Sequence, residues 1–288
     1  VDPASTGATG HRGGDAVVDA NTAMPLMLCN GERATAQQLA NAALFNYGHF
    51  TTLQVRDGAV RGLDLHLQRL HQGNQALFGA ALDTARLREQ MRAALTCFGS
   101  SDAGLRITIA GPIPDPRRDA PVAAPDLLIA VSPPAHMPTA GLHVQSALHQ
   151  RSAPQLKHVG TFAQWQFRRQ ALASGHDDAV FIDVAGQILE GTFWNLGLWR
   201  QGRVVWPQGP VLQGTQQRLL QAGLTALGIE QQAAPVSIAE LKRFDGAFAC
   251  NARGQQAIVA IDGLRWPDQA ARVEVLAHAL QTQPRQRI

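Results

Sequence analysis

Short apolar runs separated by turn residues predict a mixture of strands and helices in the first half of the chain. The run from Leu26 to Cys29 has the length and composition of a strand, and a second run leads into Asp57-Gly58, a dipeptide typical of tight β-hairpins. Apolar residues at helical spacing then predict helices around 64–79 and 84–98, followed by strands at 105–110 and 126–132. This order of elements predicts an α+β domain over about residues 27–135.

The second half of the chain continues the same mixture. A helix is expected over about 162–174, with Gly175 suited to the residue that follows its end. Apolar runs separated by Gly-containing turns predict the next strands at 179–183, 187–189, 196–199 and 204–207. These elements predict a second domain over residues 141–288.

Two segments are expected to lie outside these domains. Consecutive prolines within 133–140 predict a stiff interdomain linker. Residues 1–23 are rich in Gly, Ala, Asp and Thr, with no apolar periodicity and no signal-peptide pattern. We therefore expect residues 1–23 to be a flexible leader or an expression remnant outside the fold.

Lys157 is the most informative candidate for chemistry, because the chain holds only two lysines, Lys157 and Lys242, and otherwise uses arginine as its basic residue. Lys157 lies in a weakly polar stretch. A desolvated lysine amine can lose its proton and attack a carbonyl, which arginine cannot do. The alternative is an ordinary lysine at a strand edge with its amine in solvent. Glu190, at the end of an apolar run, is a second candidate, or else a carboxylate that only neutralises a nearby arginine.

Several short motifs follow one another in an order that resembles the class IV aminotransferases. This is the fold-type IV family of pyridoxal-phosphate enzymes, which includes branched-chain and D-amino acid aminotransferases and 4-amino-4-deoxychorismate lyase. The motifs are Asn30-Gly31, Gly48-His49-Phe50-Thr51-Thr52, His66-Leu67-Gln68-Arg69-Leu70, Lys157-His158, Asp177-Asp178-Ala179, Asp183-x-x-Gly186, Glu190-Gly191-Thr192-x-x-Asn195 and Leu212-x-Gly214. The resemblance covers about residues 27–263. It implies a two-domain α+β fold with a smaller N-terminal α/β sandwich and a larger C-terminal pseudo-barrel.

The resemblance also implies the cofactor, pyridoxal 5′-phosphate, and the residues that hold it. Lys157 would carry the cofactor as a Schiff base and shuttle the proton, and Glu190 would pair with the pyridine nitrogen. Arg69 would hold the phosphate, where its planar fork suits an oxyanion. Gly214 and Thr215, before a predicted helix, would offer backbone N–H groups to the same phosphate. Asn195, Asn251 and Ala252 complete the expected cofactor residues. Taken without the resemblance, Arg69 could be a surface arginine and Gly214 a loop glycine.

Substrate residues are harder to assign. The resemblance implies Tyr47, His49, Thr51 and Thr192 on the substrate side, and we expect the aromatic cluster around Tyr47 in a loop. The family's arginine-glycine pair after the third strand is replaced by Ala110-Gly111. Arg117 and Arg118, in the proline-rich loop that follows, could bind a substrate carboxylate instead or simply be solvated. The phosphate turn also departs from the family, because Gly214-Thr215-Gln216-Gln217 lacks the usual threonine in its slot.

The expected function is therefore a class IV aminotransferase that transfers an amino group between an amino acid or amine and a 2-oxo acid. The lyase reaction on 4-amino-4-deoxychorismate is the alternative, since Lys157-His158 and Asn251 resemble the lyases. A less favoured alternative is a cofactor-binding scaffold without catalysis. The family resemblance also implies a homodimer.

Composition is consistent with these expectations. The net charge of +3 is mild, and no basic patch interleaved with aromatic residues points to nucleic acid. No apolar run is long enough to span a membrane, and the ten histidines lack metal-site spacing. Three widely spaced cysteines argue against a disulfide framework and suit the reducing cytoplasm.

Overall fold

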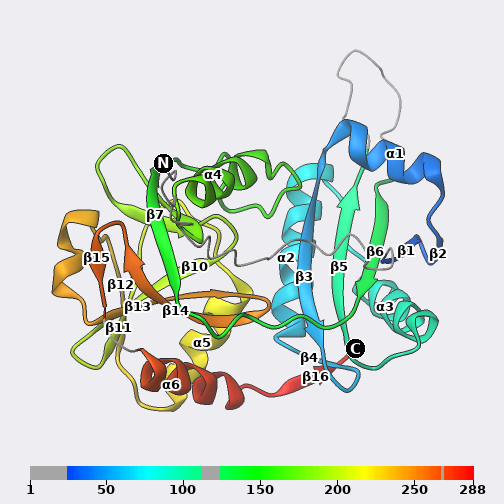
Figure 1. The fold of residues 1–288 in the computed structure, drawn as a ribbon. Helices are drawn as coiled ribbons and strands as arrows, with labels where there is room; N and C mark the ends of the chain where they lie inside the picture. The colour runs from blue at the N-terminus through cyan, green and yellow to red at the C-terminus, as the bar shows by residue number, and fades with distance from the viewer. Residues whose placement is uncertain (1–24, 112–123, 267–268) are drawn as a thin grey trace, which may run out of the picture.

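The structure is a computed structural model that describes residues 25–111, 124–266 and 269–288. Two large sheets lie side by side, one in each half of the chain, and a two-stranded sheet is also present among the described residues (Figure 1). The first half spans residues 25–132 and the second half residues 142–281. The predictions for residues 1–23 and for Arg117 and Arg118 fall outside the described residues.

The sheet of the first half has five strands in the order β2-β1-β6-β5-β3. The strands are β1 (Leu26–Cys29), β2 (Glu32–Arg33), β3 (Gly48–Val55), β5 (Ala103–Ala110) and β6 (Asp126–Ser132). Helices α2 (Leu63–Phe78) and α3 (Thr84–Phe98) bury Leu70, Leu87 and Met91 against one face of this sheet. Fully removing such side chains from water stabilises the fold by about 1.5–3 kcal/mol each.

Local sequence explains where these elements begin and end. Asp83 caps α3 by accepting a hydrogen bond from the Arg86 backbone N–H, and Gly79 and Gly99 end α2 and α3 in the left-handed region. The predicted hairpin is confirmed: Asp57 and Gly58 both have positive φ between β3 and β4 (Ala59–Arg61). The helices expected around 64–79 and 84–98 are also confirmed.

One expectation in the first half holds only in part. Tyr47 lies outside helix and strand as expected, but Phe45 is the last residue of helix α1 (Ala36–Phe45), and His49 and Phe50 are buried in β3. No residue of α1 is buried, so its apolar residues mark no core-facing stripe in the sequence.

The sheet of the second half runs β12-β11-β10-β13-β14-β7-β8-β9, with β15 paired to β14. Its strands are β7 (Leu142–Leu148), β8 (Asp178–Ile182), β9 (Ile188–Gly191), β10 (Asn195–Arg200), β11 (Arg203–Pro207), β12 (Gln231–Ala234), β13 (Gly246–Asn251), β14 (Gly254–Ile261) and β15 (Leu264–Arg265). Side chains from strands far apart in this order, such as Val144, Ile188 and Leu198, share one core, so the sheet curls around them. The expected pseudo-barrel is confirmed.

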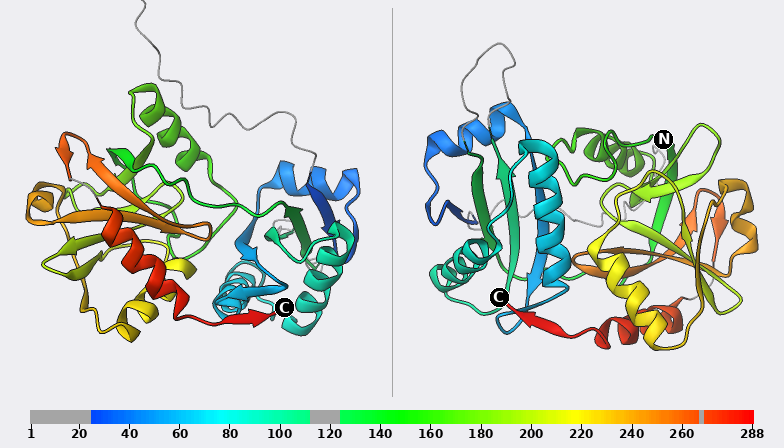
Figure 2. Two further views of the ribbon diagram at one scale, coloured as in Figure 1. Left: turned by 60° about the horizontal axis from the view of Figure 1, so that its bottom comes forward. Right: turned by 180° about the vertical axis from the view of Figure 1, so that it is seen from behind.

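The helices of the second half lie outside this curl. Helix α5 (Thr215–Ala226) and α6 (Ala270–Gln281) cover a second apolar cluster on the sheet, and α4 (Phe162–Ala173) packs near β8 (Figures 1 and 2). A short 3₁₀ helix spans Ile238–Arg243. The helix expected over 162–174 is confirmed, with Gly175 in the left-handed region just after it.

Two pairings tie the halves together. The final strand, β16 (Arg285–Arg287), leaves the second half and pairs with β4 (Figure 2). The segment around Lys157 pairs with β3, the edge strand of the first sheet. Residues 133–141 connect the halves without a helix or strand, and the domain boundaries stay a prediction.

Candidate active site

Lys157 lies on a segment between β7 and α4 that runs along the edge of β3. The Phe50 N–H donates to the Lys157 carbonyl at 2.9 Å, and the Val159 N–H donates to the Gly48 carbonyl at 3.0 Å. This pairing fixes the Lys157 backbone in an extended conformation. The Lys157 Nζ atom lies 4.8 Å from the centre of the Phe50 ring. The side chain lines a cavity of about 400 Å³ together with His49, Arg69 and Thr215.

The surroundings of Lys157 favour its neutral form. Burial, followed by the charges of Arg69 and Arg151, lowers the pKa of the amine to about 7, and the charge of Glu190 acts in the opposite direction. A substantial fraction of the amine is therefore unprotonated and nucleophilic at neutral pH. The amine therefore lies beside the Phe50 ring in the wall of a cavity, and its catalytic role stays a prediction.

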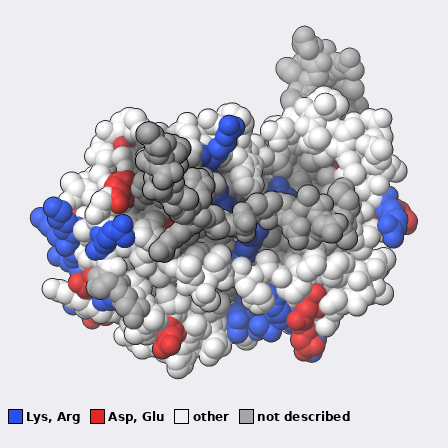
Figure 3. Space-filling view, in the orientation of Figure 1, with Lys and Arg blue, Asp and Glu red and all other residues white. Residues whose placement is uncertain are grey.

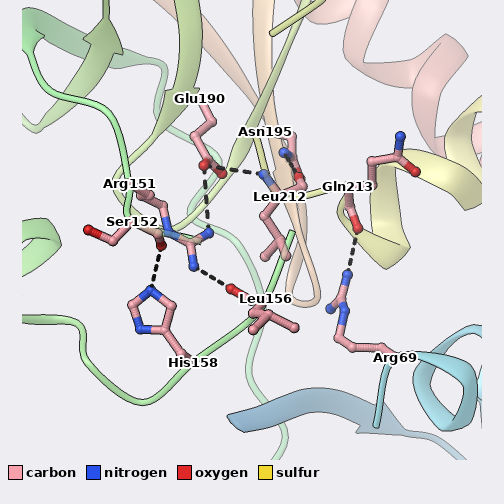
Figure 4. Close-up of polar contacts among 9 residues, drawn as sticks. All are labelled: Arg69, Arg151, Ser152, Leu156, His158, Glu190, Asn195, Leu212 and Gln213. Carbon is pink, nitrogen blue, oxygen red and sulfur yellow. Dashed lines mark hydrogen bonds and ion pairs between the residues drawn. The ribbon is translucent and has the colours of Figure 1, made fainter. Parts of the chain in front are cut away.

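Glu190 is buried on β9, and one of its oxygens has two partners. Oε1 lies 3.6 Å from Nη1 of Arg151 and accepts a hydrogen bond from the Leu212 N–H at 3.3 Å (Figure 4). Burial raises the pKa of the carboxyl to about 7, and the Arg151 charge opposes that rise. The carboxylate is thus poised to change protonation near neutral pH.

Arg151 is a site residue that the sequence analysis missed. Its guanidinium contacts Glu190 on one side and donates from Nη2 to the Leu156 carbonyl at 2.8 Å on the other (Figure 4). Leu156 directly precedes Lys157, so Arg151 joins the buried carboxylate to the lysine segment. No sequence signal marks this arginine among the others, because its partner lies on a strand that only the fold brings near.

The start of helix α5 forms a tight corner beside the cavity. Asn195 Nδ2 donates to the Leu212 carbonyl at 2.7 Å, and a Cβ placed on Gly214 would lie 2.0 Å from Asn195 Oδ1. Glycine is therefore required at 214 by the close approach of Asn195. Among the described residues no side chain caps the helix at Gly214, so the N–H groups of its first turn are available to an anion.

Arg69 lies opposite this corner on α2. Its Nη2 atom donates to the Gln213 carbonyl at 2.7 Å (Figure 4). Burial, then the charges of Arg218 and Arg151, lower the pKa of Arg69 to about 10. Neighbouring positive charges and a helix N-terminus together suit a bound oxyanion.

Other predicted residues are placed away from this cavity. Thr192 Oγ1 donates to Asp178 Oδ1 at 2.6 Å, and Tyr47 donates its hydroxyl to the Leu77 carbonyl at 3.1 Å. Thr51 is buried, and its Oγ1 lies 2.7 Å from His66 Nδ1.

Of the remaining predicted residues, His49 does reach the large cavity, where burial lowers its pKa to about 4. Asn251 Nδ2 donates to the Phe193 carbonyl at 3.3 Å, and its Oδ1 accepts from the Arg253 N–H at 2.9 Å. Ala252 lines a different, smaller cavity.

Arg106 on β5 is a second missed residue. Its guanidinium carbon lies 3.6 Å from the centre of the Phe50 ring, so Lys157 and Arg106 share one aromatic neighbour. The Arg106 charge also contributes to the lowered pKa of Lys157. Arg106 is therefore a third arginine, after Arg69 and Arg151, whose charge acts on the Lys157 amine.

Comparison with known proteins agrees with this geometry. The family profile for amino-transferase class IV matches residues 48–261, so the chain belongs to the class IV aminotransferase family. A search of curated proteins returns no match.

Among solved structures, the chain is similar to a hypothetical aminotransferase from Mycobacterium tuberculosis in its PLP-bound form. That pair is 21% identical, with 90% of this chain and 99% of the other covered and a TM-score of 0.74. A 4-amino-4-deoxychorismate lyase from Pseudomonas aeruginosa is 27% identical, with 86% and 97% covered and a TM-score of 0.72. A branched-chain amino acid aminotransferase from Escherichia coli is 20% identical, with 88% and 92% covered and a TM-score of 0.75.

Proposed function

We propose that the protein is a pyridoxal-phosphate-dependent aminotransferase that uses Lys157 as its reactive amine. The observation that carries this proposal is the Lys157 amine itself, whose pKa is lowered to about 7 and which faces a cavity of about 400 Å³. Family membership supports the same conclusion.

The residues around the cavity fit this cofactor. The open N-terminus of α5 and the Arg69 guanidinium are donors for a phosphate. Glu190 offers a buried carboxylate to a ring nitrogen, and Lys157 offers a neutral amine to an aldehyde. When bound, pyridoxal phosphate supplies an electron-accepting ring that eases loss of the proton at the amino-bearing carbon.

Each side chain has a separate task in this proposal. Lys157 Nζ would hold the cofactor and would also take and return the substrate proton, a task suited to an amine with a pKa close to 7. Glu190 stays ionised when it faces a positive ring nitrogen, because an opposite charge offsets the cost of its burial. Arg151 holds Glu190 in place from the other side.

A labelling experiment tests the assignment of Lys157. Protein saturated with pyridoxal phosphate is reduced with borohydride, digested and mapped by mass spectrometry. We expect the pyridoxyl mass on Lys157 and absent from Lys242. Label on Lys242, or none on either lysine, would refute the assignment. Lys157→Ala should abolish turnover, and Lys157→Arg should not restore it, because guanidinium stays protonated.

The lyase reaction is the second candidate, favoured by His158 beside Lys157 and by the 27% identity to the Pseudomonas aeruginosa lyase. In the structure the His158 ring bonds the Ser152 carbonyl at 3.1 Å, so its role lies in shaping the segment. The two reactions are separated by their products. An aminotransferase converts an amino donor and a 2-oxo acid into the swapped pair, whereas the lyase releases pyruvate from 4-amino-4-deoxychorismate. Colour from bound cofactor with neither activity would favour the non-catalytic scaffold.

We further propose a homodimer in the cytoplasm. Large apolar side chains are exposed on α1 (Leu44, Phe45) and on α4 (Phe162, Trp165, Leu172). An apolar surface of this kind is typical of a protein interface. All three cysteines are unpaired, which fits a reducing compartment, and among the described residues no helix is long and apolar enough to cross a bilayer. A fully active monomer in light scattering at assay concentration would refute the dimer.

A further inference from the structure

Two carboxylates are buried among the described residues, those of Glu190 and Asp178. Lys and Arg atoms gather along the boundary between the two halves on the face shown in Figure 3, whereas these two carboxylates are hidden inside. The proposed chemistry uses Glu190 and gives Asp178 no task. Burying an ionised carboxylate is costly unless its oxygens accept hydrogen bonds, so the partners of Asp178 indicate what it does.

Asp178 begins β8, and both of its oxygens accept hydrogen bonds from the connection between β9 and β10. Oδ1 accepts from the Thr192 hydroxyl at 2.6 Å, and Oδ2 accepts from the Trp194 indole N–H at 3.1 Å. Oδ1 also accepts from the Ala179 backbone N–H at 2.8 Å, and the Arg168 Nε atom on α4 lies 3.8 Å from Oδ2. Two of the donors around this carboxylate thus belong to one short connection.

This connection, residues 191–194, joins two residues of the candidate site. Glu190 directly precedes it and Asn195 directly follows it. Glu190 accepts from the Leu212 N–H at 3.3 Å, and Asn195 donates to the Leu212 carbonyl at 2.7 Å (Figure 4). Leu212 lines the large cavity and lies two residues before Gly214, the residue that precedes α5. The shape of the connection therefore links the position of Glu190 to that of the helix N-terminus.

Side chains, more than the strand ladder, hold this connection in place. The ladder between β8 and β9 is irregular, and its last pair joins Val180 to Gly191. A Cβ on Gly191 would collide with the Trp194 ring, so the indole folds back against the backbone of the connection. Trp194 is buried in this position, and its N–H points to Asp178. Without that carboxylate the indole N–H would be a buried donor with no acceptor.

We propose that Asp178 is a positioning residue for the cofactor site. By holding Thr192 and Trp194, it keeps the connection in one shape. That shape orients Glu190 toward the ring nitrogen and Asn195 toward the corner of α5. The inference rests on the proposed function for the identity of the cofactor, whereas the contacts stand without it. Among the described residues that line the large cavity Asp178 is absent, so it acts only through its neighbours.

Asp178→Asn tests the proposal with little change of shape. The amide keeps one oxygen, so either the Thr192 hydroxyl or the Trp194 indole loses its acceptor. Titration with pyridoxal phosphate, followed by absorbance, should show binding weakened about ten- to a hundred-fold, as for one buried donor left unpaired. The matched control is Asp183→Asn at the other end of the β8–β9 hairpin, where Asp183 accepts from two backbone N–H groups. The control should lower Tm and leave cofactor binding unchanged.

Rescue separates positioning from general stability. Trp194→Phe removes the indole donor, so Asp178→Asn should weaken cofactor binding less in the Trp194→Phe background than in the parent protein. The absorbance of the bound cofactor changes with pH, and the midpoint of that change should move in Asp178→Asn, because ionisation of the ring is coupled to Glu190. A residue that only stabilises the fold would lower Tm and leave the midpoint and the affinity at the parent values. That result would overturn the proposal.

A measurement on the cofactor-free protein keeps the test independent of the proposed function. The Leu212 N–H donates to Glu190, so freeing the connection should speed its hydrogen exchange. In mass spectrometry, peptides covering residues 211–214 should exchange faster in Asp178→Asn and at the parent rate in Asp183→Asn. Faster exchange confined to residues 178–194, or spread equally over the chain, would refute the link to Leu212. If the parent protein binds no pyridoxal phosphate, the proposed function fails, and the exchange result alone decides whether Asp178 positions Glu190.

Discussion

Replacing Arg151 by glutamine should destabilise the cofactor-free protein in a pH-dependent way. The Arg151 and Glu190 side chains are each 7% exposed, and their charged atoms are 3.6 Å apart. Removing one partner of such a pair commonly costs 3–5 kcal/mol, because the other charge is left buried and unpaired. Glu190 can avoid part of that cost by binding a proton, since its pKa is already about 7 in the intact protein.

The size of the effect follows from this pKa. At pH 7, protonating a carboxyl with a pKa of about 7 costs less than about 0.5 kcal/mol. The main loss is then the charge-assisted hydrogen bond to the Leu156 carbonyl, about 1.5–3 kcal/mol. We therefore expect about 2 kcal/mol at pH 7.

The sign of the pH dependence is fixed by the direction of the Glu190 shift. The folded-state pKa is raised from the ordinary value of 4.5 to about 7, so in the parent protein burial of Glu190 carries no penalty below about pH 4.5, a growing one between pH 4.5 and 7, and a constant one above pH 7. Loss of Arg151 raises this pKa further, and the penalty keeps growing above pH 7. The stability difference should thus widen from pH 7 to pH 9, by up to about 1.4 kcal/mol per unit, and narrow toward pH 5.

Urea unfolding at pH 5, 7 and 9 measures this difference. The matched control is Arg203→Gln, whose ion pair with Glu230 is shorter, at 2.7 Å, but solvent-exposed. Exposed pairs contribute at most about 1 kcal/mol, so the control should lose less at every pH. A loss for Arg151→Gln no larger than the control's, or one that is constant from pH 5 to 9, would refute this account of the pair.

Two further predictions concern the lysine and the corner at α5. With limiting acetic anhydride at pH 7.5, Lys157 in the cofactor-free protein should be acetylated faster than the exposed Lys242, because burial lowers its pKa to about 7; equal rates by mass spectrometry would contradict a neutral amine. Gly214→Ala should lower the free energy of unfolding by about 1–3 kcal/mol, because its Cβ would lie 2.0 Å from Asn195 Oδ1. Gly263→Ala is the matched control, because a Cβ at Gly263 meets nothing within 4 Å. Equal Tm shifts for the two variants in calorimetry would show that the Asn195 side chain moves away from the new Cβ at little cost.

Elements with local signals could be predicted from the sequence. The hairpin at Asp57-Gly58 and the ends of α2 and α3 at Gly79 and Gly99 are set by residues that tolerate positive φ. Helix α1 was missed because no residue in it is buried, although its capping box, Thr35 with Gln38, was readable. Strand β16 was missed because its partner lies at the opposite end of the chain.

The residues of the candidate site also fall into those that the sequence identified and those that only the fold reveals. The scarcity of lysine identified Lys157 without any structure, and motif order identified Glu190. Arg151 and Arg106 could not be found, because their significance comes from neighbours that only the tertiary fold supplies. Thr192 resembled a substrate residue in sequence, yet its hydroxyl is directed to Asp178.

The pairing of the Lys157 segment with β3 has a consequence for synthesis of the chain. Strand β3 lies at one edge of the first sheet. The hydrogen bonds from this edge to Lys157 and Val159 form only after Lys157 and Val159 have left the ribosome. At about 5–20 residues per second, the nascent first half spends seconds with an open strand edge, and β4 waits longer still for β16. An open edge can pair with another chain. Slow translation between Gly111 and Val159 should therefore promote aggregation, and the first half should not persist alone as a soluble fragment.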